Sequence, residues 1–198
     1  MECRQIAIIG AGGHGRVVAD IARLCGYETI LFFDDGDVPG RVGSVADVDA
    51  YLNTSDVFVA IGNNRVRKMI TERLLKKPVT LVHPKAVVAG DAVLGCGVVV
   101  MAGAVVNPGA TIGDGAIINT GSSVDHDCIV GPYVHISVGA HLAGTVCVGE
   151  GVFICAGAVV INNICVCDHA VIGAGAVVVK DIAEPGTYIG IPARKQLR

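Results

Sequence analysis

Large aromatic side chains are scarce in this sequence of 198 residues, which contains no tryptophan and in which Phe and Tyr together make up only 4% of the positions. Compact domains usually fill their cores with such rings, so a bulky globular core is not expected. No apolar run approaches about 18 residues, because Gly, Asp and Asn interrupt every one, and this excludes a membrane-spanning helix. The net charge is −3 and no basic stripe is present, so nucleic acid is not an expected partner.

The eight cysteines include no C-x-x-C pair, and we expect them to be reduced, small, apolar residues of a cytoplasmic protein. Cys165 and Cys167 stand two positions apart, but two thiolates without further ligands nearby do not predict a metal site. The segment from Met1 to Ile9 has too short an apolar run for a signal peptide.

The residues that are abundant, 27 glycines and many aliphatics, form a strict repeat of six. Residues 86–181 divide into sixteen uninterrupted hexads, whose third position is always Val, Ile or Leu and whose sixth position is Gly in nine. Units this short cannot fold alone, but stacked units share a continuous core. An α-helix would need spacings of three and four, and an ordinary β-sandwich would need irregular loops. The repeat therefore predicts a parallel β-helix.

The first quarter of the chain has a different pattern. Residues 4–10, Thr29–Phe33 and Val57–Ile61 are expected strands, with helices at Arg16–Cys25 and Arg65–Lys77, which together predict a Rossmann-like βαβαβ domain over residues 1–82. The first strand is followed by Gly10-x-Gly12-x-x-Gly15, the dinucleotide fingerprint. The unit is only half of a doubly wound NAD domain, so a UDP-linked substrate, with its pyrophosphate on the glycine amides, fits better than NAD. A tight turn that binds nothing is the alternative.

Polar residues accompany this glycine turn. His14 is expected to be exposed and to donate to a phosphate or sugar. Asp34 and Asp35 end the second strand, where they can accept from sugar hydroxyls or from a protonated amine, or can simply cap turns.

One hexad, residues 122–127, departs from the aliphatic pattern because its corner carries His126 between Asp125 and Asp127. A histidine held by a carboxylate can act as a general base. If three hexads form one coil, residue n lies beside residue n+18, so Gly144 stacks on His126 and its amide can serve as an oxyanion donor. His135 and His141 fall on different faces, which disfavours a zinc site made by one chain.

The hexads resemble those of hexapeptide-repeat acyltransferases, and the whole chain is similar to the bacterial UDP-4-amino-sugar N-acetyltransferases of the bacillosamine pathway and to sialic-acid O-acetyltransferases. The shared motifs are Gly12-Gly13-His14-Gly15, Asp34-Asp35, Ile61-Gly62-Asn63-Asn64, His83-Pro84, Asn119-Thr120, His126-Asp127-Cys128-x-Val130-Gly131, His135-Ile136-Ser137-Val138-Gly139-Ala140 and Gly190-Ile191-Pro192-Ala193-Arg194.

This resemblance implies a left-handed β-helix over residues 83–198, a homotrimer with intersubunit active sites, and acetyl-CoA as co-substrate, without a metal. It implies catalytic roles for His126 and Asp127, although the bacillosamine enzymes have Glu at the second position. It places the acetyl-CoA cleft along Asn119, His135, Gly144, Ala156 and Ala174. It places the UDP-sugar against Gly12, Gly13, His14, Asp34, Asp35, Gly62 and Asn63.

The expected reaction is N-acetylation of a UDP-linked 4-amino-4,6-dideoxy sugar by direct transfer. Three alternatives remain open from the residues: O-acetylation of a sugar hydroxyl, a metal-dependent hydratase resembling γ-class carbonic anhydrases, and a non-catalytic nucleotide-binding scaffold. His83 and His169 are expected to be structural.

Overall fold

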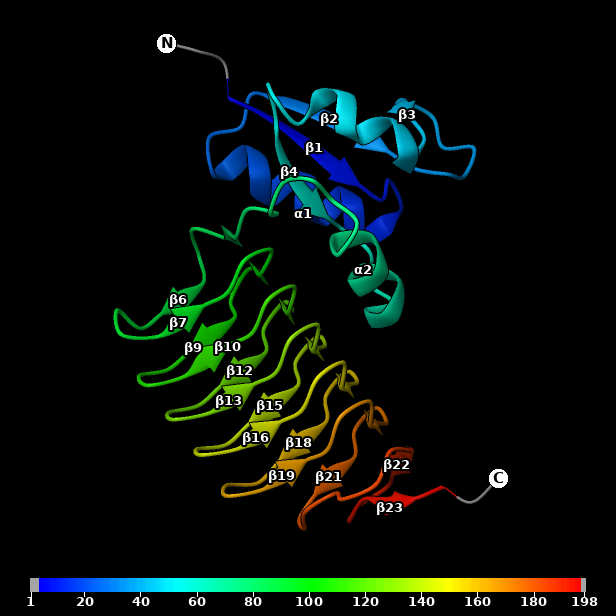
Figure 1. Cartoon of the computed structure of the whole chain (residues 1–198). Helices are drawn as coiled ribbons and strands as arrows, with labels where there is room; N and C mark the ends of the chain where they lie inside the picture. The colour runs from blue at the N-terminus through cyan, green and yellow to red at the C-terminus, as the bar shows by residue number, and fades with distance from the viewer. Residues whose placement is uncertain (1–3, 197–198) are drawn as a thin grey trace.

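The computed structural model describes residues 4–196 and shows a small α/β domain above a prism of stacked coils (Figure 1). Cys3, one of the cysteines expected to be reduced, lies outside these residues, as does the beginning of the segment tested for a signal peptide. Within residues 4–196 no helix is both long and apolar enough to cross a membrane.

The N-terminal domain is a four-stranded parallel sheet in the order β3-β2-β1-β4. Its elements are β1 (Gln5–Ile9), α1 (Gly13–Leu24), β2 (Thr29–Phe33), β3 (Arg41–Gly43), the 3₁₀ helix η1 (Val45–Tyr51), β4 (Asp56–Val59) and α2 (Asn64–Thr71). The expected βαβαβ pattern did not include β3, and the connection from β2 to β4 contains the 3₁₀ helix η1 in place of an α-helix. The predicted basic helix was also too long, since α2 ends at Thr71 and not at Lys77; Pro78 disfavours helix in the residue before it.

The prism is a left-handed parallel β-helix with three faces. The eight-stranded face holds β5 (Leu81–Val82), β8 (Val99–Val100), β11 (Ile117–Ile118), β14 (His135–Ile136), β17 (Phe153–Ile154), β20 (Val171–Ile172), β22 (Thr187–Ile189) and β23 (Arg194–Lys195). The six-stranded face holds β6 (Val87–Val88), β9 (Val105–Val106), β12 (Ser123–Val124), β15 (His141–Leu142), β18 (Val159–Val160) and β21 (Val177–Val178). The five-stranded face holds β7 (Val93–Leu94), β10 (Thr111–Ile112), β13 (Ile129–Val130), β16 (Cys147–Val148) and β19 (Cys165–Val166).

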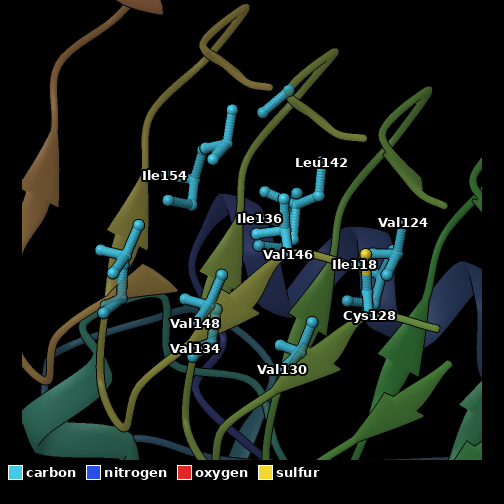
Figure 2. Close-up of a cluster of buried hydrophobic side chains, with 14 of the residues drawn as sticks. Ile118, Val124, Cys128, Val130, Val134, Ile136, Leu142, Val146, Val148 and Ile154 are labelled. Carbon is cyan, nitrogen blue, oxygen red and sulfur yellow. The ribbon is translucent and has the colours of Figure 1, made fainter. Parts of the chain in front are cut away.

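The eighteen-residue register expected from the hexads is confirmed, for example by the pairing of Thr111 with Ile129 and of His135 with Phe153. The third hexad positions point into the prism and are buried from Val100 to Val178, whereas Val88 and Leu94 in the first coil are half-buried. Figure 2 shows inward-pointing side chains from the first and third hexad positions packed together, among them Ile118, Ile136 and Ile154 from successive coils. β-Branched side chains suit such short, closely stacked strands.

The two parts share a hydrophobic core. Side chains of β1 and α1 are buried together with Leu81, Val99, Met101 and Ile117 on the eight-stranded face. The thiol of Cys25, just after α1, donates to the Val82 carbonyl at 3.3 Å. The N-terminal domain therefore covers the first coils of this face, and α2 lies beside the later ones (Figure 1). The predicted division between residues 82 and 83 stays a prediction.

Candidate active site

His126 lies at the corner between β12 and β13, which we call the His126 edge (residues 125–127 and 143–145). Its Nδ1 is 2.9 Å from Oδ2 of Asp127, and the two side chains are 57% and 65% exposed. Asp127 adopts a φ of 57°, a left-handed conformation that short polar side chains tolerate. Although Asp is one methylene shorter than Glu, it reaches the imidazole at this corner.

The acidic neighbours of His126 favour its protonated form. The hydrogen bond to Asp127 is the main cause that raises the His126 pKa, and the negative charges of Asp125 and Asp127 add to it. Asp125 accepts hydrogen bonds from Asn107 and from the His126 amide, which lower the pKa of the Asp125 carboxyl. The imidazole is therefore a stronger base than an isolated histidine, and no hydrogen bond of the described residues occupies its Nε2.

Gly144 lies one coil beyond His126, as the register predicts, and the Thr145 amide donates to the His126 carbonyl at 2.9 Å. A Cβ at Gly144 would lie 2.6 Å from Cε1 of the imidazole and would also overlap Nε2. The Gly144 amide donates to no other backbone group of the described chain. The backbone of these residues therefore leaves the Gly144 N–H unused, next to the His126 ring.

His135 lies on the eight-stranded face with 8% of its surface exposed, and its ring stacks on Phe153 at 4.9 Å. The Asn119 side chain approaches Nε2 at 3.0 Å, and its own oxygen accepts the Thr120 amide, so the Asn119 amide group donates to Nε2. The proton of the neutral His135 ring is thereby assigned to Nδ1, which is buried without a hydrogen-bond partner among the described residues.

His14 was predicted to be exposed, but it is half-buried and its Nε2 has no hydrogen-bond partner among residues 4–196. The prediction failed because α1 packs against the prism and brings the His14 ring to 6.4 Å from that of His135. Burial, followed by the positive charge of Arg67, lowers the pKa of both histidines to about 4. Both rings are therefore neutral at physiological pH.

The glycine turn lies at the carboxyl end of β1, where Gly12 caps α1 and the space around Gly12 and Gly13 is open. A Cβ at Gly15 would collide with the Gly10 carbonyl, so this position requires glycine. Exposed amides at the first turn of α1 form a suitable place for a phosphate.

Asp34 and Asp35 both accept backbone amides. Asp34 accepts those of Ala11 and Gly36, each at 2.8 Å, and Asp35 accepts that of Val45 at 2.9 Å. These bonds lower the Asp34 pKa. Asp34 thus joins the glycine turn to the loop after β2, and Asp35 joins that loop to the start of η1. These contacts are of the turn-capping kind that the sequence left open.

A cavity of about 860 Å³ lies between α2 and the eight-stranded face. On the side of α2 it is lined by Gly62, Asn63, Asn64, Arg65 and Lys68, and on the side of the prism by Tyr133, His135, Glu150, Gly151, Phe153, His169 and Val171. The Asn63 side chain also caps α2 by accepting the Val66 amide at 3.1 Å. His169, expected to be structural, is a wall of this cavity.

Sequence reasoning missed several of these wall residues. Phe153 and Val171 stand 18 and 36 positions after His135. The eighteen-residue register could have found both. On the other side, Gly62 and Asn63 were expected in the site, whereas Arg65 and Lys68 of α2 carried no comparable signal.

The residues expected in the site fall into two groups within one chain. Asn119, Ala156 and Ala174 lie at the corner between the eight- and six-stranded faces, which we call the Asn119 edge (residues 119–121, 155–157 and 173–175), with His135 on the adjoining face. His126 and Gly144 lie at the other end of the six-stranded face. His135 and His141 are on different faces, as expected. Residues 4–196 contain no cluster of three His, Cys, Asp or Glu side chains that could hold a metal.

Two families match this sequence, the PglD N-terminal domain over residues 5–74 and the bacterial transferase hexapeptide (six repeats) over residues 91–126. An alignment 112 residues long, which covers 50% of the chain, shows 38% identity to UDP-N-acetylbacillosamine N-acetyltransferase of Bacillus subtilis. This match spans 52% of the relative, about half of its length.

Solved structures match over nearly the full chain. The acetyltransferase domain of PglB from Neisseria gonorrhoeae is 44% identical with a TM-score of 0.93, covering 98% of this chain and 100% of that one. A second structure of that domain, 43% identical with a TM-score of 0.93 and covering 98% and 99% of the two chains, is a complex with acetyl coenzyme A. PerB from Caulobacter crescentus, in complex with CoA and GDP-perosamine, is 39% identical with a TM-score of 0.90 and covers 97% of each chain.

Proposed function

The chain belongs to the family of hexapeptide-repeat sugar N-acetyltransferases with a PglD N-terminal domain, and from this premise we propose that it transfers the acetyl group of acetyl-CoA to the amino group of a nucleotide-linked amino sugar. The observation that carries the proposal is the His126–Asp127 pair, whose imidazole lies next to Gly144 of the adjacent coil. A base and an oxyanion donor on adjacent coils are what aminolysis of a thioester requires.

In the proposed reaction the sugar nitrogen attacks the thioester carbonyl carbon while Nε2 of His126 takes the proton from that nitrogen. The Gly144 amide donates to the oxygen of the tetrahedral intermediate. When the carbon–sulfur bond breaks, the thiolate of CoA leaves and can take the proton back from the imidazolium. Asp127 holds the ring through Nδ1 and stabilises its charged form. No acyl-enzyme is needed, because both substrates meet in one site.

The acceptor is proposed to be a UDP-linked 4-amino-4,6-dideoxy sugar, bound with its pyrophosphate on the amides near Gly12 and Gly13 and close to His14, Gly62 and Asn63. The relative from Caulobacter holds GDP-perosamine, so the nucleotide needs a direct test. We expect release of CoA thiol with the UDP-amino sugar, and a kcat/KM at least about tenfold lower with its GDP counterpart.

The same assay compares the acceptor group. An analogue that carries a hydroxyl in place of the amine is expected to give no turnover above hydrolysis. Faster transfer to the hydroxyl would instead establish an O-acetyltransferase. Failure to bind CoA would favour a scaffold, and a stoichiometric metal required for activity would favour a hydratase.

The separation of the two groups of residues supports an intersubunit site. We propose a homotrimer in which acetyl-CoA lies between the Asn119 edge of one subunit, with Ala156 and Ala174, and the His126 edge of the next. One chain keeps these edges apart across its six-stranded face, so a cleft formed by two subunits would bring His126 to the thioester and to the amine.

Subunit mixing tests this arrangement. His126→Ala and His135→Ala are each expected to be inactive as pure trimers. A random equal mixture, refolded or co-expressed, is expected to recover about a quarter of wild-type activity, because each mixed trimer of a cyclic arrangement keeps one intact site. A mixture as inactive as its parents would place the whole site in one subunit.

A further inference from the structure

Arg67 of α2 is the largest fully buried side chain in the described structure, with 1% of its surface exposed. Burial lowers its pKa to about 10, so the guanidinium remains charged at neutral pH. No carboxylate of residues 4–196 forms an ion pair with it. A buried charge without a counter-ion is costly, and its retention calls for a specific reason.

The partners of Arg67 are oxygens from both parts of the molecule. Its Nη1 donates to the carbonyls of Ile61 and Gly62 at 2.8 and 3.2 Å, at the turn that follows β4. Its Nε donates to Gly115 at 2.7 Å and its Nη2 to Tyr133 at 2.8 Å, on two successive coils of the prism. The guanidinium therefore bridges the end of the N-terminal sheet and the coils that lead into β11 and β14.

Asn64 extends this bridge by one coil. Its side-chain oxygen accepts Nη2 of Arg67 at 2.9 Å, and its amide group donates to the carbonyls of Gly151 and Val152 at 3.0 and 3.1 Å. Gly115, Tyr133 and Gly151 stand 18 residues apart, so the turn at residues 62–64 is fastened to three stacked coils. A planar group with five donors can make this set of contacts, whereas an ammonium cannot.

We propose that Arg67 is a positioning residue, which fixes the 62–64 turn against the prism and so sets the distance between the nucleotide end of the site and His135. Arg67 touches neither substrate in this arrangement. It acts through Gly62, Asn63 and Asn64, which line the cavity. The expected change in KM rests on the proposed function. The expected changes in UDP binding and in the pKa values of His14 and His135 do not depend on catalysis.

The charge of Arg67 also acts on the two buried imidazoles. It lowers the pKa of His14 and of His135, in both cases after the larger effect of burial, and His14 lowers the pKa of His135 further. The Gly62 carbonyl opposes this at His135. The other charged or titratable side chains on the cavity wall include Lys68 and Glu150, which pair with each other, as well as Arg65, Tyr133 and His169. The positive charge of Arg67 thus disfavours protonation of both His14 and His135.

The test compares Arg67→Met and Arg67→Lys with Arg73→Met, which removes an exposed arginine shortly after the same helix. We expect Arg67→Met to raise the KM for the UDP-amino sugar at least about tenfold and to leave the KM for acetyl-CoA within about twofold, since small displacements of a positioned group have large effects. Arg67→Lys should be intermediate, because it keeps the charge but loses the fork. Arg73→Met should match the wild type.

Two measurements without turnover separate this inference from the proposed function. The affinity for UDP alone should fall most in Arg67→Met, less in Arg67→Lys and not at all in Arg73→Met, in parallel with the rise in the KM for the UDP-amino sugar. In imidazole NMR titrations of the unliganded trimer, the pKa values of His14 and His135 should rise from about 4 in Arg67→Met, without reaching 6.5 because burial remains, and should stay low in Arg67→Lys. A lower melting temperature with unchanged UDP binding and unchanged imidazole pKa values would overturn the proposal and leave Arg67 a purely structural residue. If Arg67→Met does not fold, UDP binding is measured for Arg67→Lys instead. Weaker binding than in the wild type supports the proposal, and unchanged binding overturns it.

Discussion

Replacement of His126 by alanine is expected to lower kcat for acetyl transfer by about 10²–10⁴-fold, the usual contribution of a general base. The KM values should change little, because the imidazole is exposed at an edge and its main bonds are to neighbouring residues of the same turn. The melting temperature should also remain close to that of the wild type. Steady-state thiol release with saturating substrates measures the effect. Activity within tenfold of the wild type would show that His126 is not the base.

Asp127→Asn provides the companion to this variant, since it keeps the shape of the side chain and removes its charge. Because the hydrogen bond to Asp127 is the main cause that raises the His126 pKa, its weakening should lower that pKa. The base accepts a proton only when neutral, so the rate falls as the pH decreases through the His126 pKa. The acidic limb of the pH–rate profile should therefore move to lower pH, with a lower maximum rate. Ionisation of the substrate amine affects the pH–rate profiles of the wild type and of Asp127→Asn equally. The shift between the two profiles therefore reports on the pKa of His126.

Replacement of Gly144 by alanine is expected to lower kcat by about 10–10²-fold, because displacing a catalytic group by about 1 Å has effects of this size. The added Cβ would occupy the position of the His126 ring and force the imidazole to rotate away from Asp127. The exposed ring can move at little cost, so stability should be nearly unchanged. Gly144 is also not among the glycines with positive φ, and its backbone accepts alanine without strain.

Gly90→Ala is the matched control for this substitution. It too lies in the prism, has no positive φ, and would place its Cβ in open space. Full activity in Gly90→Ala with loss in Gly144→Ala would assign the effect to the contact with His126. Equal activity in both variants would mean that the imidazole does not work from the position above Gly144.

The hexads determined most of the fold by themselves. A strict period of six indicates a parallel β-helix, and sixteen Val, Ile or Leu residues identify the positions that point inward. The left hand and the three hexads per coil followed only from the family resemblance. Once three hexads per coil are taken from that resemblance, the sequence also places Gly144 against His126, because each coil of a β-helix stacks on its neighbour in the chain. Even the acidic corner was visible, because its residues are consecutive.

Only the tertiary structure decided what surrounds His14 and His135. The burial of His14 and the tautomer of His135 depend on α1 packing on the eight-stranded face and on Asn119 beneath it. Arg67 looked like one more cation of a basic helix, yet it is buried among carbonyls contributed by residues up to 67 positions away. Such contacts depend on how two separate elements dock. No periodicity within either element encodes that docking, whereas the repeat specifies its own neighbours.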